Sequence, residues 1–206
     1  MKRTGLWLLL LMGLTGCLGG TRPAPLVKHY VLEYPPPRME SPVPIPAPLR
    51  VERFSAARLY AGPEMIFRRG ALQREAYRDR RWRISPADLV TDLLRRDLRQ
   101  AGLFQAVLTT RDREEPRFAL EGGLEEFLEV EGPGRDRKAQ LAATLTLLDL
   151  AGRGIQERVV FQKSYRYEVA CTQEGAAGLA EAMSRAMSQF SAQAIGDIDA
   201  ALKKGR

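Results

Sequence analysis

The second half of the chain carries two long strand-like runs joined by a glycine turn, and this feature restricts the fold more than any other. Residues 138–150 and 155–172 flank Gly152-Arg153-Gly154. In the second run one parity is apolar or aromatic, namely Val159, Phe161, Tyr165, Tyr167, Val169 and Cys171. The other parity is polar, namely Gln162, Ser164, Arg166 and Glu168. Because successive strand side chains point to opposite faces, this pattern predicts a long antiparallel pair with one buried face.

Two amphipathic runs supply helices that can cover that face. From residue 174 to about 203, apolar side chains recur at steps of three and four: Leu179, Met183, Ala186, Met187, Phe190, Ala194, Ile198 and Leu202. A second helix is predicted over 85–102, with Leu89, Val90, Leu93, Leu94, Leu98 and Ala101 as its stripe. Ser85 is a suitable N-cap, Pro86 takes the first helical position, and Asp88 completes a capping box. Gly102 ends the helix because it readily adopts a left-handed conformation.

Shorter runs that favour strands complete the pattern, at residues 28–34, 49–56, 64–69, 72–79, 105–110 and 118–130, the last with a break allowed at Gly122-Gly123. The runs 64–69 and 72–79 flank Gly70-Ala71 and predict a β-hairpin. With 45% hydrophobic residues, the chain can bury a substantial core. The order of elements predicts one α+β domain over residues 28–206, with two helices packed on one face of a mostly antiparallel sheet.

The N-terminus predicts a cleaved and lipidated protein. Lys2 and Arg3 precede an apolar run from Leu6 to Leu14 that is too short to span a bilayer, which predicts a signal peptide over residues 1–16. Leu14-Thr15-Gly16-Cys17 resembles the lipobox of bacterial lipoproteins. The resemblance implies a diacylglycerol on the Cys17 sulfur and an acyl chain on its new amino group, and we expect no other cofactor. The alternative is a soluble secreted protein with an incidental cysteine.

The anchor leads into a tether and a proline-rich connector. Residues 17–27 are small and contain Gly and Pro, which is typical of a flexible tether. Residues 35–48 contain seven prolines in fourteen positions, which argues against helix and against an interior strand. Leu18 follows Cys17 where an Asp commonly retains lipoproteins in the inner membrane. We therefore expect the periplasmic face of the outer membrane of a Gram-negative bacterium.

Residues suited to catalysis are sparse, and we predict no enzyme, no catalytic residue and no metal site. His29, the single histidine, lies beside the tether and is interpreted as a strand-surface side chain. Cys171 falls on the apolar parity of its strand, as a buried free thiol does. The acidic run Glu121, Glu125, Glu126, Glu129 and Glu131 lacks the spacing of a calcium loop and is interpreted as a solvated strand edge.

The positive charge is concentrated in one segment. Loss of Lys2 and Arg3 with the signal peptide lowers the net charge from +7 to +5. Between residues 68 and 83 lie Arg68, Arg69, Arg74, Arg78, Arg80, Arg81 and Arg83, with Trp82 among them. One interpretation is a solvated hairpin, and the other is a docking surface for an acidic partner or anionic lipid headgroups. We expect reversal of Arg78, Arg80 and Arg81 to glutamate to weaken a salt-sensitive contact without unfolding. Nucleic acid is not an expected partner in the periplasm.

From Tyr30 to about Val107 the chain resembles the ABC-type transport auxiliary lipoprotein family, which includes the PqiC-like lipoproteins. The pattern is Tyr30-Val31-Leu32, Val51, Phe54, Tyr60, Met65-Ile66-Phe67-Arg68, Tyr77, Trp82, Pro86, Leu89, Leu98 and Gly102-Leu103-Phe104, with Gly123-Leu124 and Phe127 agreeing more loosely. Phe67 stands where the family pattern has Tyr, and the proline-rich segment is longer than usual.

The resemblance implies a non-catalytic outer-membrane lipoprotein that works with an inner-membrane ATPase, a permease and an MCE-domain substrate-binding protein in lipid transport. It would dock that substrate-binding protein at the membrane, and a homo-oligomer stays open. Two other functions also stay open. One is a carrier that holds a lipid or another hydrophobic ligand between helices and sheet. The other is an envelope assembly lipoprotein that braces an outer-membrane β-barrel.

Overall fold

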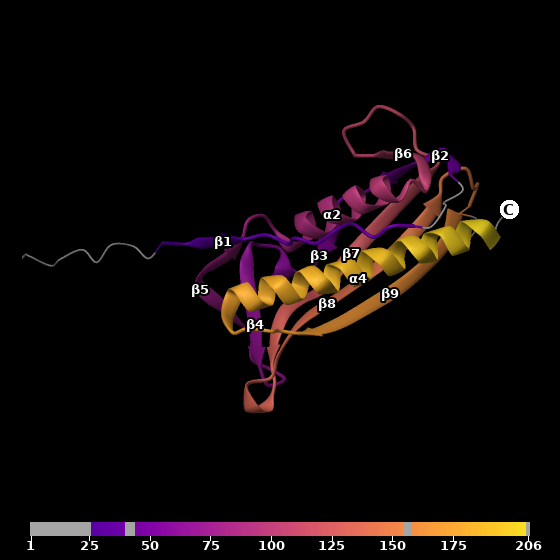
Figure 1. Ribbon diagram of the computed structural model, residues 1–206. Helices are drawn as coiled ribbons and strands as arrows, with labels where there is room; N and C mark the ends of the chain where they lie inside the picture. Colours follow the sequence, from indigo (N-terminus) through magenta and orange to yellow (C-terminus); the bar gives the residue numbers. More distant parts are fainter. Residues whose placement is uncertain (1–25, 40–43, 155–157, 205–206) are drawn as a thin grey trace, which may run out of the picture.

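The computed structural model describes residues 26–39, 44–154 and 158–204. Within these ranges it contains nine strands and two α-helices (Figure 1). The strands are β1 (Lys28–Tyr30), β2 (Ile45–Val51), β3 (Ser55–Ala56), β4 (Glu64–Arg69), β5 (Glu75–Trp82), β6 (Phe104–Leu108), β7 (Phe118–Glu131), β8 (Arg137–Asp149) and β9 (Val159–Ala170). The helices are α2 (Pro86–Ala101) and α4 (Gly175–Lys204), and two short 3-10 turns are η1 (Arg58–Tyr60) and η2 (Pro133–Arg135).

The sheet is curled and mixed, so the predicted α+β class is confirmed while the mostly antiparallel pairing is corrected. β7 lies in its interior, antiparallel to β8, which in turn pairs antiparallel with β9. On the other side β2, β3 and β4 follow one another along β7, each parallel to it. β5 is antiparallel to β4, and β1 is parallel to β5. Side-chain alternation identifies the buried face of a strand but not its direction, which is why the parallel pairs were missed.

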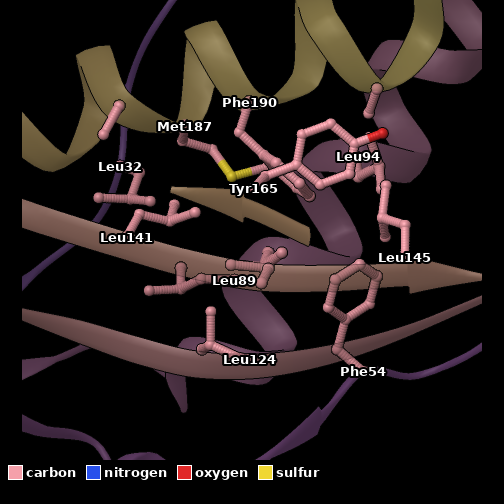
Figure 2. Close-up of a cluster of buried hydrophobic side chains, with 14 of the residues drawn as sticks. Leu32, Phe54, Leu89, Leu94, Leu124, Leu141, Leu145, Tyr165, Met187 and Phe190 are labelled. Carbon is pink, nitrogen blue, oxygen red and sulfur yellow. The ribbon is translucent and has the colours of Figure 1, made fainter. Parts of the chain in front are cut away.

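Both helices pack on the same face of the sheet, as predicted, and one apolar core fills the space between them and the strands. α2 and α4 also contact each other. Figure 2 shows the middle of this core, where Leu89 and Leu94 of α2 and Met187 and Phe190 of α4 meet Leu124, Leu141, Leu145 and Tyr165 of the sheet. Each of these side chains is buried, so the helix–sheet interface is closely packed.

The predicted caps hold α2 at both ends. The Ser85 hydroxyl accepts a hydrogen bond from the Asp88 amide at 3.3 Å and donates one to the Asp88 carboxylate at 2.6 Å. Gly102 has the left-handed φ of 65° that ends the helix. The Arg53 side chain contacts the same carboxylate at 2.5 Å, and this contact is the main cause of the lowered pKa of Asp88. These local contacts fix where α2 begins, next to the end of β5.

The chain after β1 leaves the sheet and packs onto the helices, so the strand predicted over 28–34 ends at Tyr30. The Glu33 amide donates to the Ser184 hydroxyl of α4 at 3.0 Å. The buried Tyr34 hydroxyl donates to Asp97 of α2 at 2.7 Å, and burial raises the pKa of Tyr34. Leu32 between them is part of the core. The segment that follows the tether is therefore fixed to both helices.

Two prolines lie inside an interior strand, contrary to the expectation for residues 35–48. The amide of Ile45 donates to Leu103 on the β6 side, whereas the carbonyl of Pro48 accepts from Arg117 on the β7 side. Backbone groups of successive strand residues alternate between the two sides, so Pro46 and Pro48 both face β7. β7 begins only at Phe118, opposite Leu49, so the missing proline N–H groups remove no ladder hydrogen bond.

Three further findings concern sequence-based expectations. β7 runs unbroken through Gly122-Gly123 and is irregular instead between Leu124 and Glu126. No helix in the described ranges is long and apolar enough to cross a membrane. The signal peptide and Cys17 lie outside the described residues, and lipidation of Cys17 stays a prediction.

Candidate functional site at the arginine hairpin

The predicted hairpin is formed by β4 and β5, and residues 64–83 are called the arginine hairpin below. Gly70, with a φ of 68°, permits the tight turn between the two strands. β4 pairs with β7 on its other side, up to Arg69 opposite Glu131, the last residue of β7. The turn of the arginine hairpin therefore extends beyond the end of the central strand, near the β7–β8 turn (Figure 1).

Three arginines of the hairpin are held by contacts within the protein. Arg68 donates to the Gln140 side chain at 3.1 Å. Arg80 contacts Asp79 at 2.5 Å. Arg81 donates to the Tyr77 carbonyl at 2.6 Å. All three side chains are partly buried, so their charges and donors are largely committed to the fold.

Of the other four arginines, Arg69, Arg78 and Arg83 are exposed, and Arg74 is partly buried. Arg69 contacts Glu131 at 2.7 Å with more than half of its side chain exposed. Arg74 donates to carbonyls of the hairpin turn. Arg78 and Arg83 are exposed, and neither side chain makes a hydrogen bond or an ion pair with any residue of the described ranges. The seven predicted docking arginines therefore divide into structural and accessible groups.

Trp82 belongs to the core and is not part of an exposed docking surface. It is 1% exposed and packs edge-to-face on Phe127 of β7, with ring centroids 5.2 Å apart. It is the last residue of β5, three positions before the helix cap Ser85. Its interleaving with arginines suggested a surface role, but in a strand the two neighbours of a residue face the opposite side.

The acidic run does not form a solvated edge, because β7 is paired on both sides. Glu129 is fully buried and shares a face with Phe127 of the core. The Tyr77 hydroxyl lies 3.2 Å from both of its carboxylate oxygens, and Arg137 lies 3.7 Å away. Burial is the main cause that raises the pKa of Glu129. The arginine hairpin and the acidic run therefore form one contact network across β5, β4, β7 and β8.

We expect the wild-type protein to lose stability as the pH rises, and we expect this loss to be absent from the Glu129→Gln variant. The raised pKa means that the folded state holds the proton more tightly than the unfolded chain. The contribution of Glu129 to stability is therefore complete below the ordinary value of about 4.5 and declines as the pH rises through the folded-state pKa. Melting temperatures from pH 4 to 8 check this, with the exposed Glu121→Gln as control. A wild-type advantage over E129Q that grows with pH would contradict it.

A surface groove of about 380 Å³ lies beside this network. Its lining includes Phe67, Arg69, Tyr77, Arg78, Glu131 and Arg137. Glu131 is already paired with both Arg69 and Arg137, at 2.7 and 3.3 Å. Of the other two charged residues of the lining, Glu75 accepts a hydrogen bond from Gln73, whereas the Arg78 side chain has no hydrogen-bond or ion-pair partner in the described ranges. Guanidinium groups bind carboxylates and phosphates in a two-pronged geometry, so the groove suits an anionic ligand group.

Two further reactive side chains of the described ranges are Cys171 and His29. Burial raises the pKa of the Cys171 thiol to about 11, so it is protonated at neutral pH. His29 is exposed on β1, as predicted. No group of three or more His, Cys, Asp or Glu side chains in the described ranges could hold a metal ion. What the hairpin offers is charge and hydrogen bonding, which serve binding.

A known protein family matches most of this chain. A family model described as ABC-type transport auxiliary lipoprotein component matches residues 30–194. Among curated proteins, no sequence matches this chain significantly.

The structure is similar to several solved structures. A Xanthomonas campestris protein of the DUF330 family model has a TM-score of 0.78 at 17% identity, covering 87% of this chain and 98% of its own. A second crystal structure, of an uncharacterized protein, has a TM-score of 0.65 at 12% identity, covering 84% and 99%. A hypothetical protein from Chlamydia trachomatis has a TM-score of 0.50 at 6% identity, covering 75% and 96%. At these identities the likeness concerns the fold alone.

Proposed function

Because this chain belongs to the ABC-type transport auxiliary lipoprotein family, we propose that it is the non-catalytic outer-membrane lipoprotein of an MCE-type intermembrane lipid transport system. In this role the acyl chains on Cys17 hold the protein at the periplasmic face of the outer membrane. The folded domain docks the MCE-domain substrate-binding protein. ATP hydrolysis and passage through the inner membrane belong to the ATPase and the permease.

The observation that carries this proposal is the contrast between a filled interior and an open, charged surface. A lipid carrier needs an apolar cavity, and the middle of the space between the helices and the sheet is occupied by buried side chains (Figure 2). A pocket of about 340 Å³ lies only at the edge of this space, between Leu202 near the end of α4 and Ile45 and Phe118 of the sheet. At the same time the side chains of Arg78, on β5, and Arg83, directly after β5, are exposed and have no hydrogen-bond or ion-pair partner in the described ranges. A surface of this kind favours contact with a macromolecular partner of acidic character.

The anchor and the tether suit a docking subunit. One acyl chain gives marginal membrane binding, whereas two or more chains hold a protein effectively permanently. The tether over residues 17–27 ends at β1, which lies next to β5 of the arginine hairpin. Docking arginines on β5 would thereby be kept close to the anchored end of the chain.

We expect the double reversal Arg78→Glu and Arg83→Glu to weaken binding of the MCE-domain protein at least tenfold at low salt. Both side chains are exposed and unpaired in the described ranges, so the fold should be unaffected, unlike reversal of Arg80 or Arg81, which make structural contacts. The control is Arg111→Glu with Arg113→Glu. It makes the same change of charge on exposed side chains before β7, at the opposite end of the sheet.

Co-purification of the lipidated protein from membranes, at 50 and 300 mM salt, measures this effect. Salt-sensitive capture of the MCE-domain protein that is lost only in the hairpin variant supports the proposal. Equal loss in both variants would assign the effect to net charge. Capture of an outer-membrane β-barrel in place of the MCE-domain protein, or of stoichiometric phospholipid, would overturn the docking role in favour of the other two functions.

A further inference from the structure

The turn of the arginine hairpin presents one apolar side chain that neither the core nor the docking network uses. Leu72 is 97% exposed, the largest exposure among the large hydrophobic side chains of the described ranges. It lies between Gly70, which makes the turn, and Glu75, the first residue of β5. Arg69 precedes it and contacts Glu131 with more than half of its side chain exposed, and the partly buried Arg74 follows it and donates to carbonyls of the turn. A single leucine on a protruding, basic turn is not a patch of the size that protein interfaces use.

The direction of β1 relates this turn to the predicted anchor. β1 is parallel to β5, with Lys28 opposite Arg80 and Tyr30 opposite Trp82. This shared direction holds for the three paired residues, because the register of β4 and β5 is irregular between Ala76 and Arg81, closer to the turn. Leu26, directly before β1, is 82% exposed. The described chain thus begins beside the end of β5, and the turn lies at the other end of the same hairpin (Figure 1).

The length of the tether allows the turn to reach the membrane that holds the anchor. From Cys17 to Lys28 the chain can span at most about 40 Å when fully extended. The chain from Arg80 back to Leu72 spans at most roughly 25 Å, at about 3.3 Å per residue. The anchor can therefore lie in the same membrane plane as the turn without any rearrangement of the described fold.

We propose that the turn of the arginine hairpin is a second membrane contact, in which Leu72 enters the interface of the bilayer and Arg69 and Arg74 bind the phosphates of anionic lipids. The inference rests on the Cys17 anchor of the proposed function. An isolated leucine can enter a fluid bilayer without a complementary pocket, and guanidinium groups next to it are attracted to anionic headgroups. Because the acyl chains already provide affinity, the second contact fixes the orientation of the domain and leaves Arg78 and Arg83 free for a partner.

Tryptophan fluorescence of the lipidated protein in vesicles tests the contact. The variant Leu72→Trp, reconstituted in vesicles of phosphatidylglycerol and phosphatidylethanolamine, should show a blue-shifted emission and be quenched at least twofold by brominated lipids. The control is Leu150→Trp. Leu150 is an exposed leucine at the opposite end of the sheet, where its amide bonds to Arg117 before β7, and this variant should show no such quenching. The buried Trp82 contributes the same background to both variants.

Further variants and vesicle compositions distinguish this membrane contact from the effect of the anchor and from contact with a protein. Arg69→Glu with Arg74→Glu, in the L72W background, should reduce quenching while the protein still floats with the vesicles. Vesicles without phosphatidylglycerol should give the same reduction. Flotation without any quenching of L72W would overturn the turn contact and leave the anchor intact. Failure to float would overturn both. Shielding of L72W only after the MCE-domain protein is added would assign the turn to that protein instead.

Discussion

Replacing Cys17 with serine is expected to remove all covalently attached fatty acid from this protein. The thioether to diacylglycerol requires a sulfur at that position, and a serine hydroxyl cannot form it. Leu14-Thr15-Gly16-Cys17 places the thiol directly after two small residues and a short apolar run. Metabolic labelling with radioactive palmitate measures the effect, and the label in C17S should fall to background.

The other cysteine provides the matched control for this result. Cys171 is a free thiol, partly buried against the core, and burial raises its pKa. Cys171→Ser should therefore keep the full label of the wild type. Equal labelling of wild type and C17S would refute the lipobox interpretation and, with it, every proposal that depends on a membrane anchor.

The second large effect is expected at Trp82, whose replacement by alanine should destabilise the domain by about 3–5 kcal/mol. The side chain is fully buried at the end of β5, and it packs edge-to-face on Phe127 of β7. Removing it leaves a cavity that the surrounding strands cannot fill. Chemical denaturation followed by circular dichroism gives the free energy of unfolding.

Trp82→Phe separates packing from hydrogen bonding at this site. The indole Nε1 is buried and has no hydrogen-bond partner in the described part of the protein. Phenylalanine keeps an aromatic ring on Phe127 and removes that unpaired donor, so W82F should lose clearly less stability than W82A. If W82A were as stable as the wild type but lost partner binding, Trp82 would be a docking residue after all, against its burial.

The local elements of this fold could be predicted because their signals lie within a few residues. α2 was predicted to its termini, since Ser85, Pro86 and Gly102 act on the adjacent turns of the helix. β9 and α4 followed from side-chain alternation and from the spacing of apolar residues. The apolar parity of β9 does face the core, and Tyr165 is buried there.

The partners of the strands could not be predicted in the same way. Nothing near Leu49 in the sequence specifies that it lies opposite Phe118, or that three successive short strands follow β7 in one direction. β2 can contain Pro46 and Pro48 because β7 begins only at Phe118, which lies seventy residues after Pro48 in the sequence. Long-range register of this kind is set by how the whole core packs.

The candidate site shows the same division. The sequence located the basic charge between residues 68 and 83, and the structure retains that location. Only the fold distinguishes Arg78, exposed and unpaired in the described ranges, from Arg80, which contacts Asp79. Only the fold brings Tyr77 to Glu129, which are 52 positions apart in the chain. A charge count gives no burial, and burial decides whether a charged side chain supports the fold or remains free to bind.

By itself, the sequence determined the two helices, the strands, the family and the expected lipid anchor, because each depends on a local pattern of residue types. The tertiary structure alone decided that the sheet is mixed, that Trp82 belongs to the core and that Glu129 is a buried partner of Tyr77. It also placed Leu72 on the exposed turn of a hairpin whose other end pairs with β1. The physical reason is that direction, register and burial arise from contacts between residues far apart in the sequence, and no local pattern encodes them.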